Sequence, residues 1–202
     1  MTILTLVRHG ETDWNRERRI QGSTDIPLND TGRSQAREVG ARLRERYADP
    51  SSVVVAASDL SRAAETAALI AAALGAAGPA TYPDLRERGY GQAEGVDVDE
   101  FHARWGEWAV AAVPDAEPWP QVRERALRGL QSAVRDARRA TAPVAPELVV
   151  VAHGALIREL IRHATGGEFP AQGVRLANGS THTFLLERDR LRILESPTLV
   201  TA

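Results

Sequence analysis

The chain opens on the stretch ILTLVRHG at residues 3–10, in which an apolar, β-forming run leads straight into Arg-His-Gly. Two other short runs have the same character: VVVAA at residues 53–57 and LVVVA at residues 148–152. Apolar runs of this length, bounded by polar or turn-forming residues, are typical of strands that are buried on both faces of a parallel sheet. The three runs therefore predict the core strands of the fold.

The segments between these strands predict helices and one local insertion. Strands that alternate with helices are characteristic of an α/β domain in which helices cover both faces of the sheet. We therefore expect one domain over residues 1–202, a three-layer αβα sandwich with a mostly parallel sheet, in which residues 96–120 form a small helical lid. The expected elements are a loop over 10–29, helices over 31–47, 58–74, 97–112 and 122–140 and another after Gly154, a weak strand over 80–82, and a closing hairpin of 181–187 with 191–194.

Cationic and imidazole side chains follow each of the three strands. Arg8 and His9 come after the first strand, Arg62 lies in the first turn of the helix after the second, and His153 comes after the third. Because the carboxyl ends of parallel strands share one edge of the sheet, these four side chains should converge there. Arginine offers a planar fork of donors to phosphate oxygens, a neutral imidazole can attack phosphorus, and a second one can stabilise the transferring oxygens. The glycine after each histidine would let the backbone come close to an anion.

A leaving alkoxide also needs a proton, which a carboxylic acid next to the phosphate can supply. The candidate lies in the stretch LRERGYG at residues 85–91. We favour Glu87 over Glu94, although spacing alone does not separate the two. The simplest competing interpretation is that Glu87 is a surface carboxylate paired with Arg86 or Arg88.

Composition narrows the classes of function. The formal net charge of −2 over 202 residues gives no reason to expect nucleic acid or an anionic membrane as a partner, so any affinity for phosphate must come from a local cluster of cations. The chain has no cysteine, which excludes disulfides and a cysteine nucleophile. The apolar N-terminal stretch is too short for a signal peptide or a membrane span, so we expect a cytoplasmic protein. The sequence has neither clustered aspartates nor a Gly-x-x-x-x-Gly-Lys loop, and we expect no metal and no other cofactor.

These residues lie in four motifs that together resemble the histidine phosphatase superfamily, also called phosphoglycerate mutase-like. In chain order the motifs are LVRHGETDWN at residues 6–15, SDLSRA at 58–63, Glu87 with Tyr90-Gly91, and AHG at 152–154. The match spans most of the chain, and four motifs in this order are specific, whereas Arg-His-Gly alone would be weak.

The resemblance implies a role for each matched residue. His9 would be the phosphorylated nucleophile, and Glu87 would donate and accept the proton. The family uses no metal. The residues that would bind the phosphoryl group or the rest of a small phosphomonoester are Arg8, Asn15, Gln21, Gly22, Arg62, His153 and Gly154.

Two activities of this family share a phosphohistidine intermediate: a phosphatase passes the phosphoryl group to water, and a mutase returns it to a bound phosphoglycerate. Residues 96–120 carry six carboxylates and one arginine, Arg104, a balance that would repel a substrate with both phosphate and carboxylate. Family mutases have a lysine where this chain has Val98, an asparagine where it has Ala155, and an arginine pair that has no counterpart before Pro120. We therefore expect a phosphomonoester hydrolase that acts on a small phosphorylated metabolite.

Several alternatives stay open. The chain could be a cofactor-dependent phosphoglycerate mutase, a regulatory phosphatase acting on a protein side chain, or a protein of the same fold that binds phosphorylated ligands without turnover. Loss of His9, Arg62 or Glu87 would indicate the last, and none is lost. Sugar phosphates, phosphoglycerate derivatives, cobalamin-pathway phosphates and phosphoserine all remain candidate substrates. A homodimer through an apolar edge strand or helix face is compatible with the sequence.

Three aromatic residues recur in the expected lid. Phe101, Trp105 and Trp108 stand at i, i+4 and i+7, the spacing of one helix face. Packing of the lid onto the domain is the simplest explanation. An apolar wall for a bulkier or aromatic phosphomonoester is the functional alternative.

Overall fold

The computed structural model describes residues 1–108, 111–171, 173–188 and 190–197. In this part of the chain six strands form one sheet in the order β3-β2-β4-β1-β5-β6. The strands β1, β2, β3 and β4 run parallel, whereas β5 is antiparallel to both of its neighbours, so the prediction of a mostly parallel sheet is confirmed. Their bounds are β1 (Thr2–Arg8), β2 (Val54–Ala57), β3 (Ala80–Thr81), β4 (Leu148–Ala152), β5 (Thr181–Leu186) and β6 (Leu191–Glu195).

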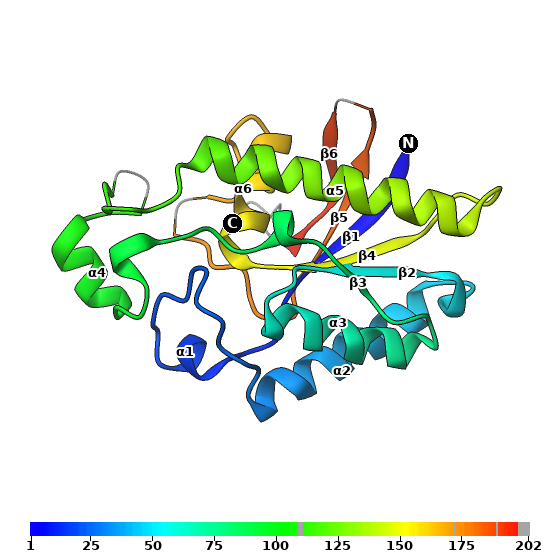
Figure 1. Cartoon of the computed structure of the whole chain (residues 1–202), viewed down its shortest axis with the longest axis horizontal. Coiled ribbons are helices and arrows are strands. Elements are labelled where there is room, and N and C mark those ends of the chain that lie inside the picture. The colour runs from blue at the N-terminus through cyan, green and yellow to red at the C-terminus, as the bar shows by residue number, and fades with distance from the viewer. Residues whose placement is uncertain (109–110, 172, 189, 198–202) are drawn as a thin grey trace.

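Helices cover both faces of this sheet, as Figure 1 shows. The helices α2 (Asp30–Arg46) and α3 (Ser61–Leu74) lie on one face, and α5 (Trp119–Thr141) and α6 (Gly154–Ala164) lie on the other. Two shorter helices, α1 (Asp13–Arg16) and α4 (Val98–Trp105), lie beyond the carboxyl ends of the parallel strands. Single 3-10 turns occupy 50–52, 83–85 and 91–93. This is the three-layer αβα arrangement expected from the alternation of elements.

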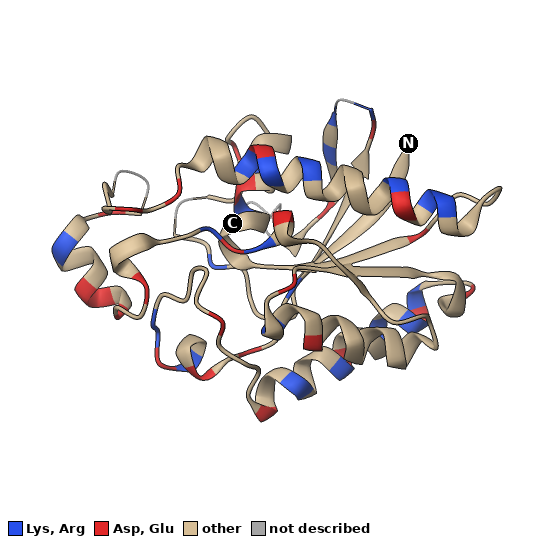
Figure 2. Cartoon of the chain, in the orientation of Figure 1, with Lys and Arg blue, Asp and Glu red and all other residues tan. Residues whose placement is uncertain are grey.

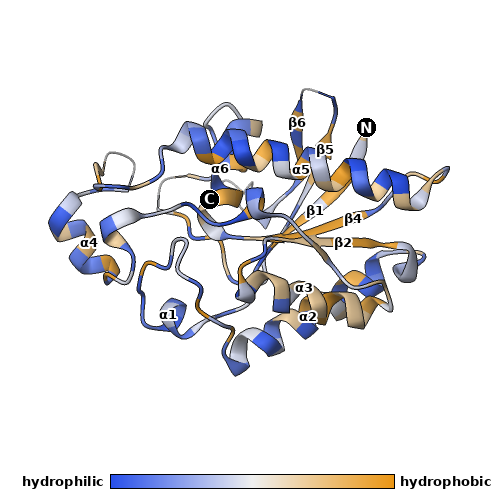
Figure 3. Ribbon diagram, viewed as in Figure 1, coloured by the Kyte–Doolittle hydropathy of each residue, from blue (hydrophilic) through white to orange (hydrophobic). Residues whose placement is uncertain are grey.

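Each face of the sheet has its own hydrophobic core. Leu4 and Leu6 of β1 belong to the core under α5 and α6, whereas Val7 belongs to the core over α2 and α3. Side chains alternate between the cores because successive residues of a strand point to opposite faces. Figure 3 shows the consequence: β2 and β4 are mostly orange, and the exposed side of α5 is blue.

Most charged side chains lie on the helices, the loops and the edge strand β6. Figure 2 shows the central strands almost free of charged residues, and both signs of charge along α4 and α5. All the blue segments are arginines, because the sequence has no lysine. Within the described ranges, no helix has the length and apolar character needed to cross a membrane.

Some boundaries near the site differ from expectation, each for a local reason. The expected loop over 10–29 contains α1, which is closed by a reciprocal capping box between Thr12 and Asn15. The helix after the second strand begins at Ser61 and not at Ser58 or Asp59, because the Ser58 N–H still pairs with the carbonyl of Val151 in β4.

The lid helix is shorter than expected. It ends at Trp105, because Gly106 takes a positive φ of 77° that a helix cannot continue. Part of the expected helix, residues 109–110, lies outside the described residues. The next helix begins at Trp119, earlier than expected, with Pro120 in its first turn, where the missing N–H costs no helical hydrogen bond.

Candidate active site

The four side chains expected to converge do lie together at the carboxyl ends of β1, β2 and β4. Register brings the histidines side by side, since Arg8 is paired with Ala152 and the next residue in each strand is a histidine. The ring centroids of His9 and His153 are 5.2 Å apart. His9, Arg62 and His153 are 3%, 1% and 0% exposed, so the cluster is buried in a region of weak screening.

Several donors of this cluster have no acceptor. In the described part of the chain, the Nε atoms of Arg8 and Arg62 and both ring nitrogens of His153 are buried without a hydrogen-bond partner. Leaving a buried polar group unsatisfied costs about 1–3 kcal/mol. A set of donors that converge without an acceptor fits an anionic ligand whose oxygens would satisfy them.

The outer ends of both guanidinium groups are already held. Nη1 and Nη2 of Arg62 donate to the carbonyl oxygens of Thr24 and Gly22, each at 2.8 Å. Nη1 of Arg8 donates to the carbonyl of Leu176. The arginines are therefore oriented before any ligand binds, which lowers the entropy lost on binding.

The tautomer of His9 follows from its one hydrogen bond. Nδ1 lies 2.6 Å from the carbonyl oxygen of Gly10, and since a carbonyl only accepts, Nδ1 carries the proton. Burial, with the positive charges of Arg62 and Arg8, lowers the pKa of His9 well below its usual 6.5. The ring is thus neutral near pH 7, with the lone pair on Nε2 available as a nucleophile.

His153 is neutral for the same physical reason. Burial, then the charges of Arg62 and neighbouring cations, lowers the pKa of His153 well below 6.5. A neutral imidazole still carries one N–H, which can donate to a ligand oxygen.

Glu87 reaches the cluster from the loop that follows β3. Its Oε2 accepts the N–H of Ala155 and its Oε1 that of Leu156, both at 3.0 Å, at the N-terminus of α6. Its negative charge also stabilises the charged forms of Arg8 and Arg62. A helix N-terminus favours negative charge, so the fold holds this carboxylate next to the cations.

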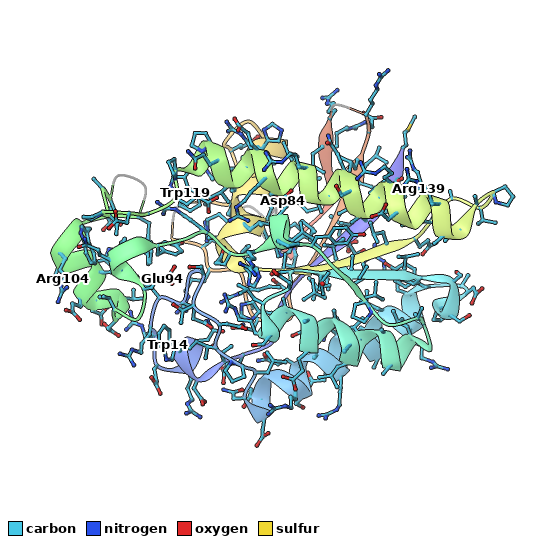
Figure 4. The ribbon with its side chains drawn as sticks, viewed as in Figure 1. Trp14, Asp84, Glu94, Arg104, Trp119 and Arg139 are labelled. Carbon is cyan, nitrogen blue, oxygen red and sulfur yellow. The ribbon has the colours of Figure 1, made fainter. Side chains whose placement is uncertain are left out.

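The two competing interpretations for this acid do not match the geometry. Arg86 forms its ion pair with Asp59 at 2.6 Å, and the Arg88 guanidinium lies 4.2 Å from the centroid of the Trp119 ring. Glu94 accepts hydrogen bonds from Ser23, Thr24 and the Tyr90 N–H instead. Through these bonds Glu94, labelled in Figure 4, joins the first loop to the segment that contains Tyr90.

The first loop supports the cluster through three of the expected residues. Gly22 contacts Arg62 through its carbonyl oxygen at 2.8 Å. Gln21 is buried, and its Oε1 accepts the hydroxyl of Thr12 at 2.9 Å. Asn15 accepts the Thr12 N–H through Oδ1, which leaves its Nδ2 as the end able to donate to a ligand.

The expectation that the glycines after the histidines bring the backbone close to an anion stays a prediction, and the structure gives both glycines a packing reason as well. A Cβ on Gly10 would lie 2.3 Å from the carbonyl oxygen of Gly32, so this glycine lets the end of β1 meet α2. A Cβ on Gly154 would lie 3.2 Å from Nε of Arg8, so this glycine leaves room for the guanidinium.

Asn178 also lies at the site, although no sequence pattern indicates it. Its Nδ2 donates to the carbonyl oxygen of His9 at 2.9 Å and to Oδ1 of Asn15 at 3.1 Å. Asn178 precedes β5, whose antiparallel pairing with β1 places the start of β5 at the site edge. Recognising that pairing would have revealed it.

Residues 96–120 pack against the first loop with a small core of their own. The Val96 carbonyl accepts the N–H of Ile20 at 2.9 Å. Phe101 is 1% exposed and stacks on Trp108 with ring centroids 4.0 Å apart, although Trp108 lies beyond the end of α4. Phe101, Trp105 and Trp108 all belong to this core, which favours the packing explanation of the aromatic stripe.

Among the residues whose placement is described, no three histidine, aspartate or glutamate side chains gather closely enough to hold a metal ion. The fold and the cluster together define an α/β protein in which two arginines and two histidines lie together at the carboxyl ends of the parallel strands. Residues 4–196 match the sequence profile of the histidine phosphatase superfamily, branch 1. The chain belongs to this superfamily.

The chain is similar to phosphatases and to mutases of the superfamily. It is 36% identical to PhoE of Bacillus subtilis, described as an uncharacterized phosphatase, over 96% of this chain and 93% of the relative. It is 35% identical to the probable phosphoglycerate mutase GpmB of Erwinia tasmaniensis, over 87% of this chain and 79% of the relative. A mycobacterial glucosyl-3-phosphoglycerate phosphatase solved with VO3 superimposes with a TM-score of 0.78 at 28% identity, covering 96% of this chain and 97% of that one.

Proposed function

We propose that this protein is a metal-independent phosphomonoester hydrolase that transfers the phosphoryl group first to His9 and then to water. The proposal rests on one observation: Arg8, Arg62 and His153 have buried polar nitrogens without hydrogen-bond partners, and they lie beside a neutral His9. An electrophile with several anionic oxygens satisfies those donors and meets the nucleophile at the same time.

In the first half-reaction Nε2 of His9 attacks phosphorus. A bond forms between this nitrogen and phosphorus as the bond from phosphorus to the ester oxygen breaks. The negative charge of the bound phosphoryl group favours the protonated form of Glu87. The leaving oxygen takes this proton, so an alcohol departs rather than an alkoxide. Arg8, Arg62 and His153 stabilise the charge on the transferring oxygens.

In the second half-reaction water replaces the alcohol. Glu87 accepts a proton from the attacking water, the bond between phosphorus and Nε2 breaks, and inorganic phosphate leaves. The enzyme returns with a neutral His9 and a protonated Glu87, ready for another ester. Each buried cation about 4 Å from a phosphoryl oxygen contributes about 4 kcal/mol at an effective dielectric of about 20. Arg8 and Arg62 are therefore the main source of stabilisation of the transition state.

Hydrolysis is favoured over mutase activity by the residues at two positions where mutases of the family carry a lysine and an asparagine. Ala155 and Val98 offer no side-chain donor to a substrate carboxylate. PhoE and the mycobacterial neighbour, both phosphatases by name, align over nearly the whole chain.

The acidic composition of residues 96–120 is only weak support for hydrolysis over mutase activity. Asp99 is paired with Arg18 at 2.9 Å and Glu117 with Arg125 at 2.6 Å, so much of the formal charge is compensated locally. The mutase therefore remains the alternative to be tested.

The substrate class in this proposal is a small phosphorylated metabolite that enters at the carboxyl edge of the sheet. Residues 96–120 would act as the lid of one domain over residues 1–202, and Asn15, Gln21, Gly22 and Gly154 would complete the phosphate environment. A cytoplasmic location is part of the same proposal.

The test combines an activity panel with capture of the intermediate. Purified protein is assayed with a chelator present against p-nitrophenyl phosphate and metabolite phosphomonoesters, and in a coupled mutase assay with 3-phosphoglycerate and its bisphosphate. We expect phosphate release, no mutase turnover, and acid-labile phosphate on His9 after rapid quenching. His9→Ala should abolish both signals, and His163→Ala, which removes an exposed histidine, should abolish neither. Wild-type turnover by His9→Ala, or mutase turnover exceeding hydrolysis, would contradict the proposal.

A further inference from the structure

Arg125 of α5 donates all of its side-chain hydrogen bonds to two segments that flank the site, the loop that carries Glu87 and the segment that carries Glu117. A guanidinium carries five N–H donors, and five acceptors lie within hydrogen-bond distance of Arg125. Three are backbone carbonyls of the loop that carries Glu87: Nη1 donates to Asp84 at 3.0 Å and to Arg86 at 2.5 Å, and Nη2 donates to Glu87 at 2.9 Å. The side chain is 14% exposed, and its contacts with Asp84 and Glu87 are partly buried, whereas the contact with Arg86 is exposed.

The other two acceptors are the carboxylate oxygens of Glu117, at the end of the lid. Nε of Arg125 donates to Oε1 at 2.6 Å and Nη2 donates to Oε2 at 2.8 Å, which is the bidentate geometry of a strong ion pair. Hydrogen bonding lowers the pKa of Glu117, chiefly through Arg125, against the opposing effect of burial.

Glu117 is also tied to the same loop from its own side. Its backbone N–H donates to the carbonyl of Gly89 at 2.8 Å, and its Oε2 accepts the Gly89 N–H at 3.3 Å. Its carbonyl accepts Nε of Arg88 at 2.8 Å. The loop 84–89 is therefore held between α5 and residue 117, and Figure 4 shows Asp84 beside α5.

This clamp acts on the backbone of the residue assigned as the acid. The Glu87 carboxylate is fixed by α6, and the Glu87 carbonyl is fixed by Arg125, so two helices set the position of one side chain. Within the described residues, neither Arg125 nor Glu117 forms a hydrogen bond with His9, Arg8 or Arg62, so the hydrogen bonds of the pair act on the reaction through the loop. The charge of Arg125 also lowers the pKa of His153 from a distance, and Arg125→Lys keeps that charge.

We propose that Arg125 and Glu117 are positioning residues that couple the end of the lid to Glu87 and hold this carboxyl group where it can protonate the leaving oxygen. The inference rests on the proposed function and deepens it, since it assigns proton delivery, rather than phosphate binding, as the step that the clamp serves. Misplacing a catalytic group by about 1 Å can cost about 10²-fold in rate.

Leaving-group dependence distinguishes this role from a merely structural one. An alkoxide needs a proton to depart, whereas p-nitrophenolate departs readily without one. A displaced Glu87 should therefore slow transfer from an alkyl phosphate far more than transfer from p-nitrophenyl phosphate. General destabilisation would lower both rates by the same factor.

The experiment measures kcat/KM, which reports the transfer to His9, for p-nitrophenyl phosphate and for the alkyl ester glycerol 2-phosphate. The variants are Glu117→Gln and Arg125→Lys, with Glu87→Gln as the reference for a missing acid. The control is Arg128→Ala on the same helix. It removes only a 3.5 Å ion pair with Asp84 of the same loop, in which both side chains are exposed. Thermal unfolding midpoints identify variants that are folded, and Glu117→Gln, which preserves shape, stands alone if Arg125→Lys does not fold.

We expect Glu117→Gln and Arg125→Lys to lose roughly 10- to 100-fold with glycerol 2-phosphate and less than about threefold with p-nitrophenyl phosphate, and Arg128→Ala to change neither. Glu87→Gln should lose more activity with glycerol 2-phosphate than with p-nitrophenyl phosphate. If it does, but Glu117→Gln and Arg125→Lys lose equally on the two esters or lose nothing, this inference alone is overturned. An unbiased Glu87→Gln would overturn the acid role of Glu87 and this inference with it.

Discussion

Lowering the pH from 7 to 5 should destabilise the protein through its buried histidines, and His182 allows the effect to be sized. This residue of β5 is 0% exposed, and its ring nitrogens lie 3.0 Å and 2.7 Å from the hydroxyls of Ser180 and Ser196. Burial lowers the pKa of His182 to about 4, against an ordinary value of 6.5. Between these values the unfolded chain binds a proton that the folded chain does not.

The sign and the size follow from this difference. The contribution of His182 to the free energy of unfolding is complete above pH 6.5. It is lost as the pH falls from there towards 4, with a slope approaching about 1.4 kcal/mol per pH unit. From pH 7 to pH 5 the loss due to His182 is about 2 kcal/mol. His9 and His153, whose pKa values are also lowered by burial, act in the same direction.

Urea unfolding followed by tryptophan fluorescence at pH 7 and pH 5 measures this loss directly. His182→Asn should lose about 2 kcal/mol less than the wild type over this interval, whatever its stability at pH 7. The control His163→Asn removes an exposed ring that meets water in both states and should follow the wild type. If His182→Asn showed the full wild-type loss, burial would not be what opposes protonation of His182.

Three further substitutions test the site. Arg62→Ala should lower kcat/KM by about 10²- to 10³-fold. Arg62→Lys should lower it by less, because lysine keeps the positive charge but not the planar pair of donors. A loss of less than tenfold for Arg62→Ala in steady-state kinetics would contradict the role of Arg62 in binding the phosphoryl oxygens. Gly10→Ala should destabilise the protein by about 1–3 kcal/mol in urea unfolding, since its Cβ would lie 2.3 Å from the Gly32 carbonyl oxygen, and unchanged stability would show that α2 can move aside. Asn178→Asp, which cannot donate to the His9 carbonyl, should reduce kcat/KM by about tenfold in steady-state kinetics; full activity would argue against a role in placing His9.

The core of the fold and the centre of the site could be predicted because both depend on local patterns. A short apolar run predicts a buried strand wherever it occurs, and parallel strands bring their carboxyl ends to one edge. This is why Arg8, His9, Arg62 and His153 could be placed together before any contact was known. The family resemblance rests on the same residues.

The remaining parts of the site depend on contacts that no local pattern encodes. The distinction between Glu87 and Glu94 came from which carboxylate meets the N-terminus of α6, and that helix begins 67 residues after Glu87, at Gly154. Asn178 reaches the site only because β5 pairs antiparallel with β1. The aromatic stripe proved to be a cluster and not a helix face, because Gly106 ends the lid helix before Trp108.

The amino-acid sequence by itself determined the class of fold, the identity of the strands and the cation and histidine cluster at their ends. Tertiary structure alone decided the burial that keeps His9 neutral, the orientation of both arginines, which carboxylate lies beside the cations, and the clamp of Arg125 on its loop. The physical reason is that strand formation follows from the apolar pattern of a few neighbouring residues. Hydrogen-bond geometry and burial, in contrast, depend on where distant segments lie, and these set the pKa values and positions on which the chemistry rests.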